Sequence, residues 1–399
     1  MRISDRISSL AASATLALNA KVQSLRQEGV DIVDFGAGQP DFPTPDAVKR
    51  AAIAAIEANK TRYTAASGLP EARAAVAHHL REEFQLEYDP AKEVLVTNGA
   101  KQALFNAVHA TADSGDEVIL FSPYWVSYPE QVRSSGATPV VVPTEDNGFR
   151  IDPDRLRAAI TDRTRTILLN SPSNPSGAVL PREDLEAIAR IAIEHDLVVV
   201  TDEIYAKMVY DGSFVPFTSL SDEIRARSIV VGAVSKTYSM TGWRFGWATG
   251  PAELIGPMAR LQAHSTSNAC SITQWAAIEA LTGDQSETEA RAVEFAKRRD
   301  RMLERIRAID GIECAEPGGA FFAFPRVDRF YGGRIDGRKI DGSLAFAEAC
   351  LDVARIALVP GLPFGSDAFV RISYATSIEE IDRGMDRFEE LVAKIEQPA

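Results

Sequence analysis

Short apolar runs alternate with helix-like stretches from about residue 90 onward. EVLVTNG precedes KQALFNAVHATA, TRTILLNSP precedes REDLEAIARIAIEH, and the runs LVVVTDEIY and SIVVGAVSK follow. LVVV and IVVGAV are apolar at successive positions, as expected for strands that are covered on both faces. The alternation of strand and helix units predicts an α/β fold with a mainly parallel sheet and helices on both faces.

The pattern changes after about residue 285. A long charged segment with helical periodicity, ETEARAVEFAKRRDRMLERIRAI, leads into GGAFFAFPRV, a helix near 343–353, ALVPG, FVRISYAT and a final amphipathic helix. This order is typical of a smaller α+β domain. No linker rich in Pro, Gly and Ser separates the two parts, so we expect them to share a broad interface.

The amino-acid composition argues against several classes of protein. The chain has 399 residues, 45% hydrophobic and 25% charged, with a net charge of −13, which argues against sequence-independent binding of nucleic acid. No apolar run approaches the ~20 residues that cross a bilayer. The three cysteines form no CxxC pair, which speaks against a zinc ribbon or a disulfide framework. We expect a cytoplasmic protein with neither a nucleic-acid nor a membrane partner, and with no metal site.

Polar residues follow four of the predicted strands. Gly99–Lys101 come after VLVTN, Asn174 after ILLNSPS, Asp202 and Tyr205 after LVVVT, and Lys236 after VVGAVS. In open α/β sheets, ligands bind at the carboxyl ends of the strands. The sequence therefore predicts one site that these residues share.

The stretch VTNGAKQAL can bind an anion, because a strand that opens directly into a helix presents free backbone N–H groups. Taken alone, an ordinary βα turn explains it better. No nucleotide P-loop is present. FGAGQPDF at 35–42 lacks the third glycine of a dinucleotide fingerprint and continues into PDFPTP, which cannot open a helix. Both nucleotide interpretations are rejected.

Three charged residues are candidates for chemistry in a buried site. Asp202, which follows LVVVT, lies either at the sheet surface or against a cationic partner, and Glu203 is the neighbour expected to be exposed. A lysine desolvated at a strand end, such as Lys236, has a lowered pKa and becomes an amine suited to Schiff-base chemistry. Arg244 would supply the positive charge that a phosphate needs, from MTGWRFGW, which suits a buried loop. Each of these residues, taken alone, could equally be a solvated charge.

The motifs taken together resemble those of the class I aminotransferases, which are pyridoxal-phosphate enzymes of fold type I. In order along nearly the whole chain they are GAGQPDFPTP, RYTAASGLPEAR, NGAKQALFNA, SPYWVSYPE, SPSNPSGAV, TDEIY, SKTYSMTGWRFG and VRISYATS. The resemblance is strongest to the shorter bacterial branch of aspartate aminotransferases, some of which also act on prephenate.

The resemblance implies a fold and an assembly. We expect a large domain at 46–285 that binds pyridoxal phosphate on a mainly parallel seven-stranded sheet. Residues 1–45 and 286–399 would form the small α+β domain. A homodimer with shared active sites is implied as well.

The resemblance also implies roles for the residues around the cofactor. Lys236 would form the internal aldimine and shuttle the substrate proton, while Asp202 would keep the pyridinium nitrogen protonated. Tyr205 and Asn174 would bond the phenolic oxygen, and Trp125 would stack on the ring.

The same resemblance implies a phosphate site and a substrate site. Gly99, Ala100, Lys101 and Arg244 would surround the phosphate, and Tyr63 would reach the phosphate of the partner subunit. Ping-pong transamination would follow.

For the substrate, Arg371 would clamp the α-carboxylate through a bidentate fork. Trp125 and Asn174 would also face the substrate, and Gly38 would let the N-terminal segment pass close to it. Lys101 and Thr15 would read a second carboxylate, which favours aspartate with 2-oxoglutarate and leaves prephenate open.

One departure weakens that assignment, because Ala11 and Ala12 stand where close relatives often have Lys-Pro. Three alternatives therefore stay open. The chain could be an aminotransferase for aromatic or other neutral amino acids, or a β- or γ-lyase on the same fold. It could also be a cofactor-binding regulator without turnover, against which the complete set of Lys236, Asp202 and Arg371 argues.

Overall fold

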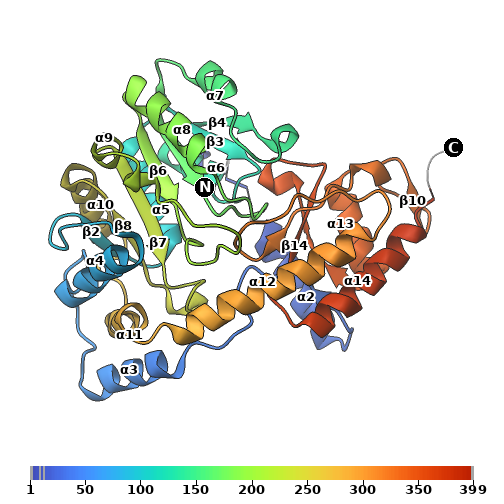
Figure 1. The fold of residues 1–399 in the computed structure, drawn as a ribbon, viewed down its shortest axis with the longest axis horizontal. Helices are drawn as coiled ribbons and strands as arrows, with labels where there is room; N and C mark the ends of the chain where they lie inside the picture. The colour runs from blue at the N-terminus through green and yellow to red at the C-terminus, as the bar shows by residue number, and fades with distance from the viewer. Residues whose placement is uncertain (1–2, 9, 12–13, 397–399) are drawn as a thin grey trace.

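A seven-stranded sheet forms the centre of the larger part of the molecule (Figure 1). The computed structural model describes residues 3–8, 10–11 and 14–396. The strand order is β2-β8-β7-β6-β5-β3-β4. The strands are β2 (Val94–Thr97), β3 (Glu117–Ser122), β4 (Thr138–Pro143), β5 (Thr164–Asn170), β6 (Val198–Asp202), β7 (Ser228–Ala233) and β8 (Gly246–Thr249). β8 is antiparallel to both neighbours and every other pair is parallel, which confirms the predicted mainly parallel sheet.

Helices cover both faces of this sheet, as the apolar runs predict. Successive residues of one strand enter different cores, because side chains alternate across a strand. Val118 and Leu120 of β3 pack in the core that contains Leu104 of α5, whereas Ile119 packs with Ile188 of α8. The helices around the sheet are α3 (Asp46–Glu57), α4 (Pro70–Phe84), α5 (Ala100–Thr111), α6 (Tyr128–Ser135), α7 (Pro153–Ala159), α8 (Arg182–Glu194), α9 (Asp222–Arg225), α10 (Ala252–Ser265) and α11 (Ser271–Thr282).

The loop expected at MTGWRFGW ends earlier than predicted. A short turn at Thr241–Trp243 is followed by β8, which begins at Gly246 and is buried along its length. Gly232 of β7 faces Trp247, and a Cβ at Gly232 would lie 2.5 Å from the indole ring. The strand forms because the glycines let two neighbouring strands approach a large aromatic ring closely.

The C-terminal residues build a second core around a small antiparallel sheet. Its strand order is β13-β14-β9, and α12 runs along it from the region of the large sheet (Figure 1). The elements are α12 (Ser286–Arg307), β9 (Phe322–Ala323), β10 (Arg334–Ile335), β11 (Arg338–Lys339), α13 (Ser343–Asp352), β12 (Ile356–Ala357), β13 (Val359–Pro360), β14 (Val370–Ser373) and α14 (Ile378–Ala393). The expected helices in this part are therefore present.

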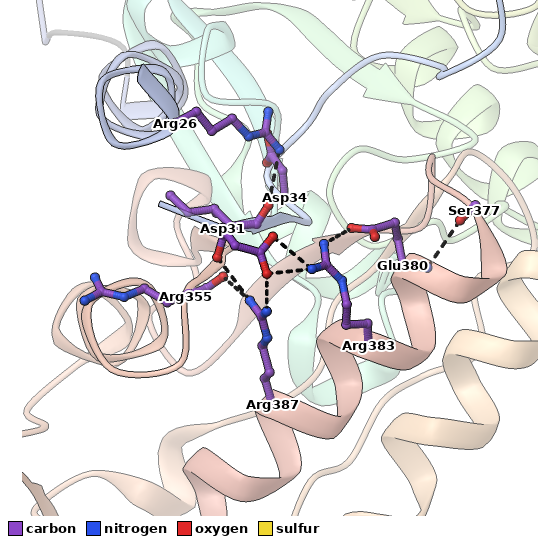
Figure 2. A network of polar contacts seen from close by, with 9 residues as sticks. Arg26, Asp31, Asp34, Arg355, Ser377, Glu380, Arg383 and Arg387 are labelled. Atoms are coloured by element: carbon purple, nitrogen blue, oxygen red, sulfur yellow. Dashed lines mark hydrogen bonds and ion pairs between the residues drawn. The ribbon is translucent and has the colours of Figure 1, made fainter. Parts of the chain in front are cut away.

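The N-terminal segment contacts both parts of the molecule. Its first helix, α1 (Asp5–Ser8), contacts α6, whereas α2 (Ala14–Gln27) and β1 (Val33–Asp34) pack against the second core, and β1 pairs in parallel with β12. Figure 2 shows Asp31 between two arginines of α14. Its Oδ2 lies 2.6 Å from Arg383 Nη1 and 2.5 Å from Arg387 Nη2. Both arginines hold the pKa of Asp31 below its ordinary value. These contacts fix the residues that lead into the segment 34–41.

None of the described helices is long and apolar enough to cross a membrane. No group of three or more His, Cys, Asp and Glu within the described ranges has the geometry to hold a metal ion.

Candidate active site

A cavity of 620 Å³ lies at the carboxyl ends of β5 and β6, between the large sheet and residues from both ends of the chain. It brings together most of the side chains that the sequence singled out. The predicted residues that line it are Gly38, Ala100, Lys101, Trp125, Asn174, Asp202, Tyr205, Lys236, Arg244 and Arg371.

Two predicted residues, Gly99 and Tyr63, do not line the cavity in this chain, and the side chain of a third, Thr15, is not described. Gly99 lies directly behind Arg244, since a Cβ on Gly99 would be 2.5 Å from Arg244 Nη2. Tyr63 is 93% exposed on the outer surface. Thr15 lies in α2, and its side chain is outside the part of the chain that the structure describes, as is Ala12.

Lys236 follows β7 and lies partly buried in the cavity, where its Nζ donates to the carbonyl oxygen of Gly38. Burial lowers the pKa of Lys236 to about 7, and the charges of Arg371 and Arg244 act in the same direction. Asp202 opposes this shift. A substantial fraction of this amine is therefore unprotonated near neutral pH, which is the form that attacks a carbonyl carbon.

Asp202 is the last residue of β6 and is 4% exposed. Its Oδ2 accepts a hydrogen bond from the Tyr128 hydroxyl at 2.8 Å, and its Oδ1 accepts from Ile204 N at 3.3 Å. Burial raises the pKa of Asp202 to about 6, while these hydrogen bonds and the charge of Lys236 work against the rise. The carboxylate can hold a cationic nitrogen in the cavity.

The prediction that Glu203 is exposed is wrong. Glu203 is 8% exposed, and its Oε1 accepts from Phe217 N and Thr201 Oγ1, each at 3.1 Å. The cause is the turn Phe217–Ser219, which covers the end of β6 on the side away from the cavity.

Arg371 reaches the cavity from β14 and is 2% exposed. Its Nη1 donates to Asn174 Oδ1 at 3.0 Å and its Nη2 to Gly36 O at 2.9 Å. Burial lowers the pKa of Arg371 to about 10. Nε has no partner among the described residues, although it is buried. A buried guanidinium held in place with an unused N–H is suited to bind a carboxylate.

Positive charge also gathers at the start of α5. Arg244 donates to Thr241 O at 2.9 Å and to Asn98 O at 3.3 Å. The ammonium of Lys101 lies 4.9 Å from the centre of the Trp125 ring. Burial and the neighbouring Arg244 lower the pKa of Lys101. A helix N-terminus beside two cations is suited to bind a phosphate.

Sequence reasoning missed several residues that line the cavity. Tyr128 bonds Asp202, and Asn170 donates from Nδ2 to Asp202 O at 2.9 Å while its Oδ1 accepts from Asn174 N at 2.8 Å. Ser235 lines the cavity beside the lysine that follows it. A signal for Asn170 was present, because it ends the apolar run ILLN; nothing in the sequence pairs Tyr128 with an acid 74 residues away.

The arrangement suits a ligand that carries a phosphate at one end and a cationic nitrogen at the other. Arg244 and the start of α5 provide the anion site, Asp202 the counter-ion, and Lys236 a nucleophilic amine. Arg371 leaves a second anion site for a carboxylate.

Comparisons with known proteins identify the family of this chain. Residues 30–388 match the family described as "Aminotransferase class I and II". An aspartate aminotransferase from Streptomyces avermitilis is 43% identical over 396 residues, which cover 98% of this chain and 97% of the relative. A probable aspartate/prephenate aminotransferase from Aquifex aeolicus is 40% identical over 397 residues, 98% of this chain and 99% of the relative.

Among solved structures, the crystal structure of the aspartate aminotransferase from Rhizobium meliloti superposes with a TM-score of 0.94 at 40% identity, covering 99% of this chain and 100% of that one. The aspartate aminotransferase from Thermus thermophilus with maleate gives a TM-score of 0.91 at 42% identity, covering 98% and 100%. The chain therefore belongs to the class I and II aminotransferases, and its activity is that of a transaminase.

Proposed function

We propose that this transaminase uses pyridoxal phosphate to transfer the amino group of L-aspartate to 2-oxoglutarate, giving oxaloacetate and L-glutamate, with prephenate as a further substrate. The observation that carries the proposal is that the amine of Lys236, with its lowered pKa, lines one cavity with Asp202 and Arg371. The class I and II family uses pyridoxal phosphate, and relatives of matching length are described as aspartate and aspartate/prephenate aminotransferases.

The residues fit the cofactor. When bound, pyridoxal phosphate supplies an electron sink that stabilises negative charge at the substrate Cα. The Nζ of Lys236 would bond the cofactor, and once released it would accept the proton from the substrate Cα. Its pKa of about 7 suits both roles, because a base works best near the operating pH.

Other side chains would hold and orient the cofactor. Asp202 would face the ring nitrogen, Tyr205 and Asn174 the ring oxygen, and Trp125 the flat face of the ring. The phosphate would lie among Gly99, Ala100, Lys101, Arg244 and Tyr63 of a second subunit.

Arg371 and Lys101 are the cations proposed to hold the carboxylates of the substrate. The fixed plane of Arg371, which Asn174 and Gly36 O hold at the wall of the cavity, supports its assignment to the α-carboxylate. Lys101 and Thr15 would bind the second carboxylate, and Gly38, whose Cβ position is 3.9 Å from Arg371 Nη2, leaves room for the substrate beside that arginine.

A homodimer with shared sites belongs to this proposal. Tyr63 is 93% exposed, and Ile53 and Ile56 of α3 are 54% and 52% exposed, which supports a subunit interface on this side. We also propose that residues 46–285 form the large domain and residues 1–45 with 286–399 the small one. The pairing of β1 with β12 supports that division.

The deciding experiment is a panel of donors and acceptors with the purified chain. Aspartate, glutamate, aromatic and neutral amino acids are each tested with 2-oxoglutarate, and prephenate is tested as an acceptor. We expect aspartate to be the preferred donor. Preference for aromatic or neutral donors would refute the dicarboxylic assignment, and release of ammonia in place of amino transfer would indicate a β- or γ-lyase.

Lys236→Ala tests the assignment as a whole. Transamination should fall to background with every donor, because the Lys236 Nζ is the group proposed both to bond the cofactor and to accept the substrate proton. Lys339→Ala on the exposed strand β11 is the control and should retain full activity. Normal turnover by Lys236→Ala would contradict the proposed function.

A further inference from the structure

We propose that Tyr128 is a positioning residue, whose hydroxyl holds the Asp202 carboxylate in the orientation and the ionised form in which it binds the ring nitrogen of the cofactor. The inference rests on the proposed function and extends it to a residue that lies behind the counter-ion.

The geometry places Tyr128 against the acid. Tyr128 is the first residue of α6, is 2% exposed and lines the cavity. Its hydroxyl is 2.8 Å from Asp202 Oδ2, and Ile204 N is 3.3 Å from Oδ1. A carboxylate accepts but does not donate, so Tyr128 is the donor. Both oxygens of the carboxylate are therefore held by the protein, which fixes the plane of the group.

Tyr128 is itself held in place by the turn that contains Trp125. The backbone N–H of Tyr128 donates to Trp125 O at 2.9 Å, and the two rings pack edge to face with centroids 5.4 Å apart. The same turn therefore presents the ring of Trp125 to the cavity and the hydroxyl of Tyr128 to Asp202. This ring contact and the burial of Tyr128 leave the tyrosine little freedom to rotate away.

The charges around Asp202 show why a donor is needed there. Lys236 attracts a negative charge on this carboxyl, whereas the neighbouring Glu203 and the hydroxyl of Tyr205, when ionised, disfavour it. Burial favours the neutral acid and raises the pKa of Asp202 to about 6. Among the effects that oppose burial, the hydrogen bond from Tyr128 is the largest.

Tyr128 itself stays protonated at any working pH. Burial raises the pKa of its hydroxyl well above the ordinary value, and the negative charge of Asp202 acts in the same direction. The residue is therefore a permanent donor, unlike a histidine, which would titrate near neutrality.

The test compares the wild-type chain with Tyr128→Phe, which keeps the ring and its contact with Trp125 and removes the hydroxyl. Tyr88→Phe is the matched control, because it removes another buried tyrosine hydroxyl, 3.2 Å from Thr218 Oγ1 and outside the cavity. The cofactor-free chains are titrated with pyridoxal phosphate in the absence of substrate, at one pH below and one above the Asp202 pKa of about 6. Thermal unfolding of the cofactor-free chains is measured in parallel.

Tyr128→Phe should bind pyridoxal phosphate about tenfold or more weakly, as expected for the loss of a hydrogen bond to a charged group. The loss should be larger at the lower pH, because without the donor Asp202 stays protonated up to a higher pH. Tyr88→Phe should bind as the wild type does. In the Asp202→Asn background, Tyr128→Phe should cause no further loss of affinity, since the group through which it acts is gone.

A purely structural role for Tyr128 predicts other results. Equal losses in the wild-type and Asp202→Asn backgrounds would overturn the inference, as would unchanged affinity in Tyr128→Phe. If Tyr128→Phe does not fold, 3-fluorotyrosine at position 128 keeps the ring and makes the hydroxyl more acidic. Its affinity curve should then shift to lower pH, and an unshifted curve would overturn the inference. A wild-type chain that does not bind pyridoxal phosphate would instead refute the proposed function.

Discussion

Burial decides the chemistry of the polar residues at the strand ends. Asp202 is buried and Lys236 is partly buried, and burial shifts each toward its neutral form, to pKa values of about 6 and about 7. Each charge partly stabilises the other, so the two groups are adjusted as a pair. The sequence predicted that these residues share one site, because each follows an apolar run. It could not predict the degree of burial, which depends on residues such as Arg371 that are distant along the chain.

Glu203 gives a prediction about stability. Burial raises its pKa from 4.5 to about 7, so in this range the folded chain binds a proton that the unfolded chain releases. The contribution of Glu203 to the free energy of unfolding should therefore fall as the pH rises from about 4.5 to about 7 and change no further above that. Glu203→Gln lacks this loss, so its stability relative to the wild type should increase over the same range.

Denaturant unfolding of the cofactor-free chains across this range measures the difference. Glu253→Gln, at an exposed position on α10, is the control and should show a constant difference from the wild type. A difference for Glu203→Gln that does not change with pH would contradict the buried, protonated carboxyl.

At the scale of elements, most strands and helices followed from periodicity, because the apolar runs of β5, β6 and β7 are continuous and buried. Two kinds of element did not follow. The direction of β8 depends on its pairing with β2 and β7. β9, β12 and β13 have two residues each, too few for any pattern, and they exist only through their tertiary partners.

The junction of β2 and α5 gives a prediction at this scale. Gly99 has φ of 79° and ψ of 166°, a conformation essentially limited to glycine, and a Cβ there would displace the Arg244 guanidinium. Gly99→Ala should lose about 1–3 kcal/mol of stability from backbone strain. It should also lose affinity for pyridoxal phosphate, because the arginine proposed to hold the phosphate has moved.

Gly115→Ala separates the two effects. Gly115 also has a positive φ, of 94°, but nothing lies within 4 Å of its Cβ position. This variant should lose stability in thermal unfolding and keep its affinity for the cofactor in titration. Equal losses of affinity in both variants would show that strain, rather than contact with Arg244, is responsible.

At the scale of the whole molecule, active sites shared between two subunits lead to a prediction that active sites within single chains would not give. In a heterodimer of Tyr63→Ala and Lys236→Ala chains, one site has both wild-type residues and the other has neither. This heterodimer should recover about half of the wild-type activity per molecule, since one of two equivalent sites is intact. It is purified through two different affinity tags and assayed at a cofactor concentration that leaves the Tyr63→Ala homodimer mostly inactive.

A heterodimer of two differently tagged Lys236→Ala chains is the control and should remain inactive. If the activity of the mixed heterodimer is no more than half the activity of the Tyr63→Ala homodimer, each active site is complete within one chain.

Long-range contacts set the limit of what the sequence could predict. The motifs identified the family and most cavity residues, because each motif is local. The contact of Tyr128 with Asp202 and the clasp of Asp31 by α14 join segments that are far apart, and neither has a local signature. Such contacts are decided by how the elements pack, which periodicity does not describe.

The cavity also makes the stability of the folded chain depend on the concentration of its ligand. Lys101, Arg244 and Arg371 all lower the pKa of Lys236, so four cationic groups raise one another's energy in a protein whose net charge is −13. An anion bound among them offsets this repulsion and stabilises the folded chain. At a ligand concentration 100 times Kd the gain is about 2.7 kcal/mol. A cell that runs short of the cofactor would therefore lose folded protein as well as activity, because the chain that lacks its anion unfolds and is degraded more readily.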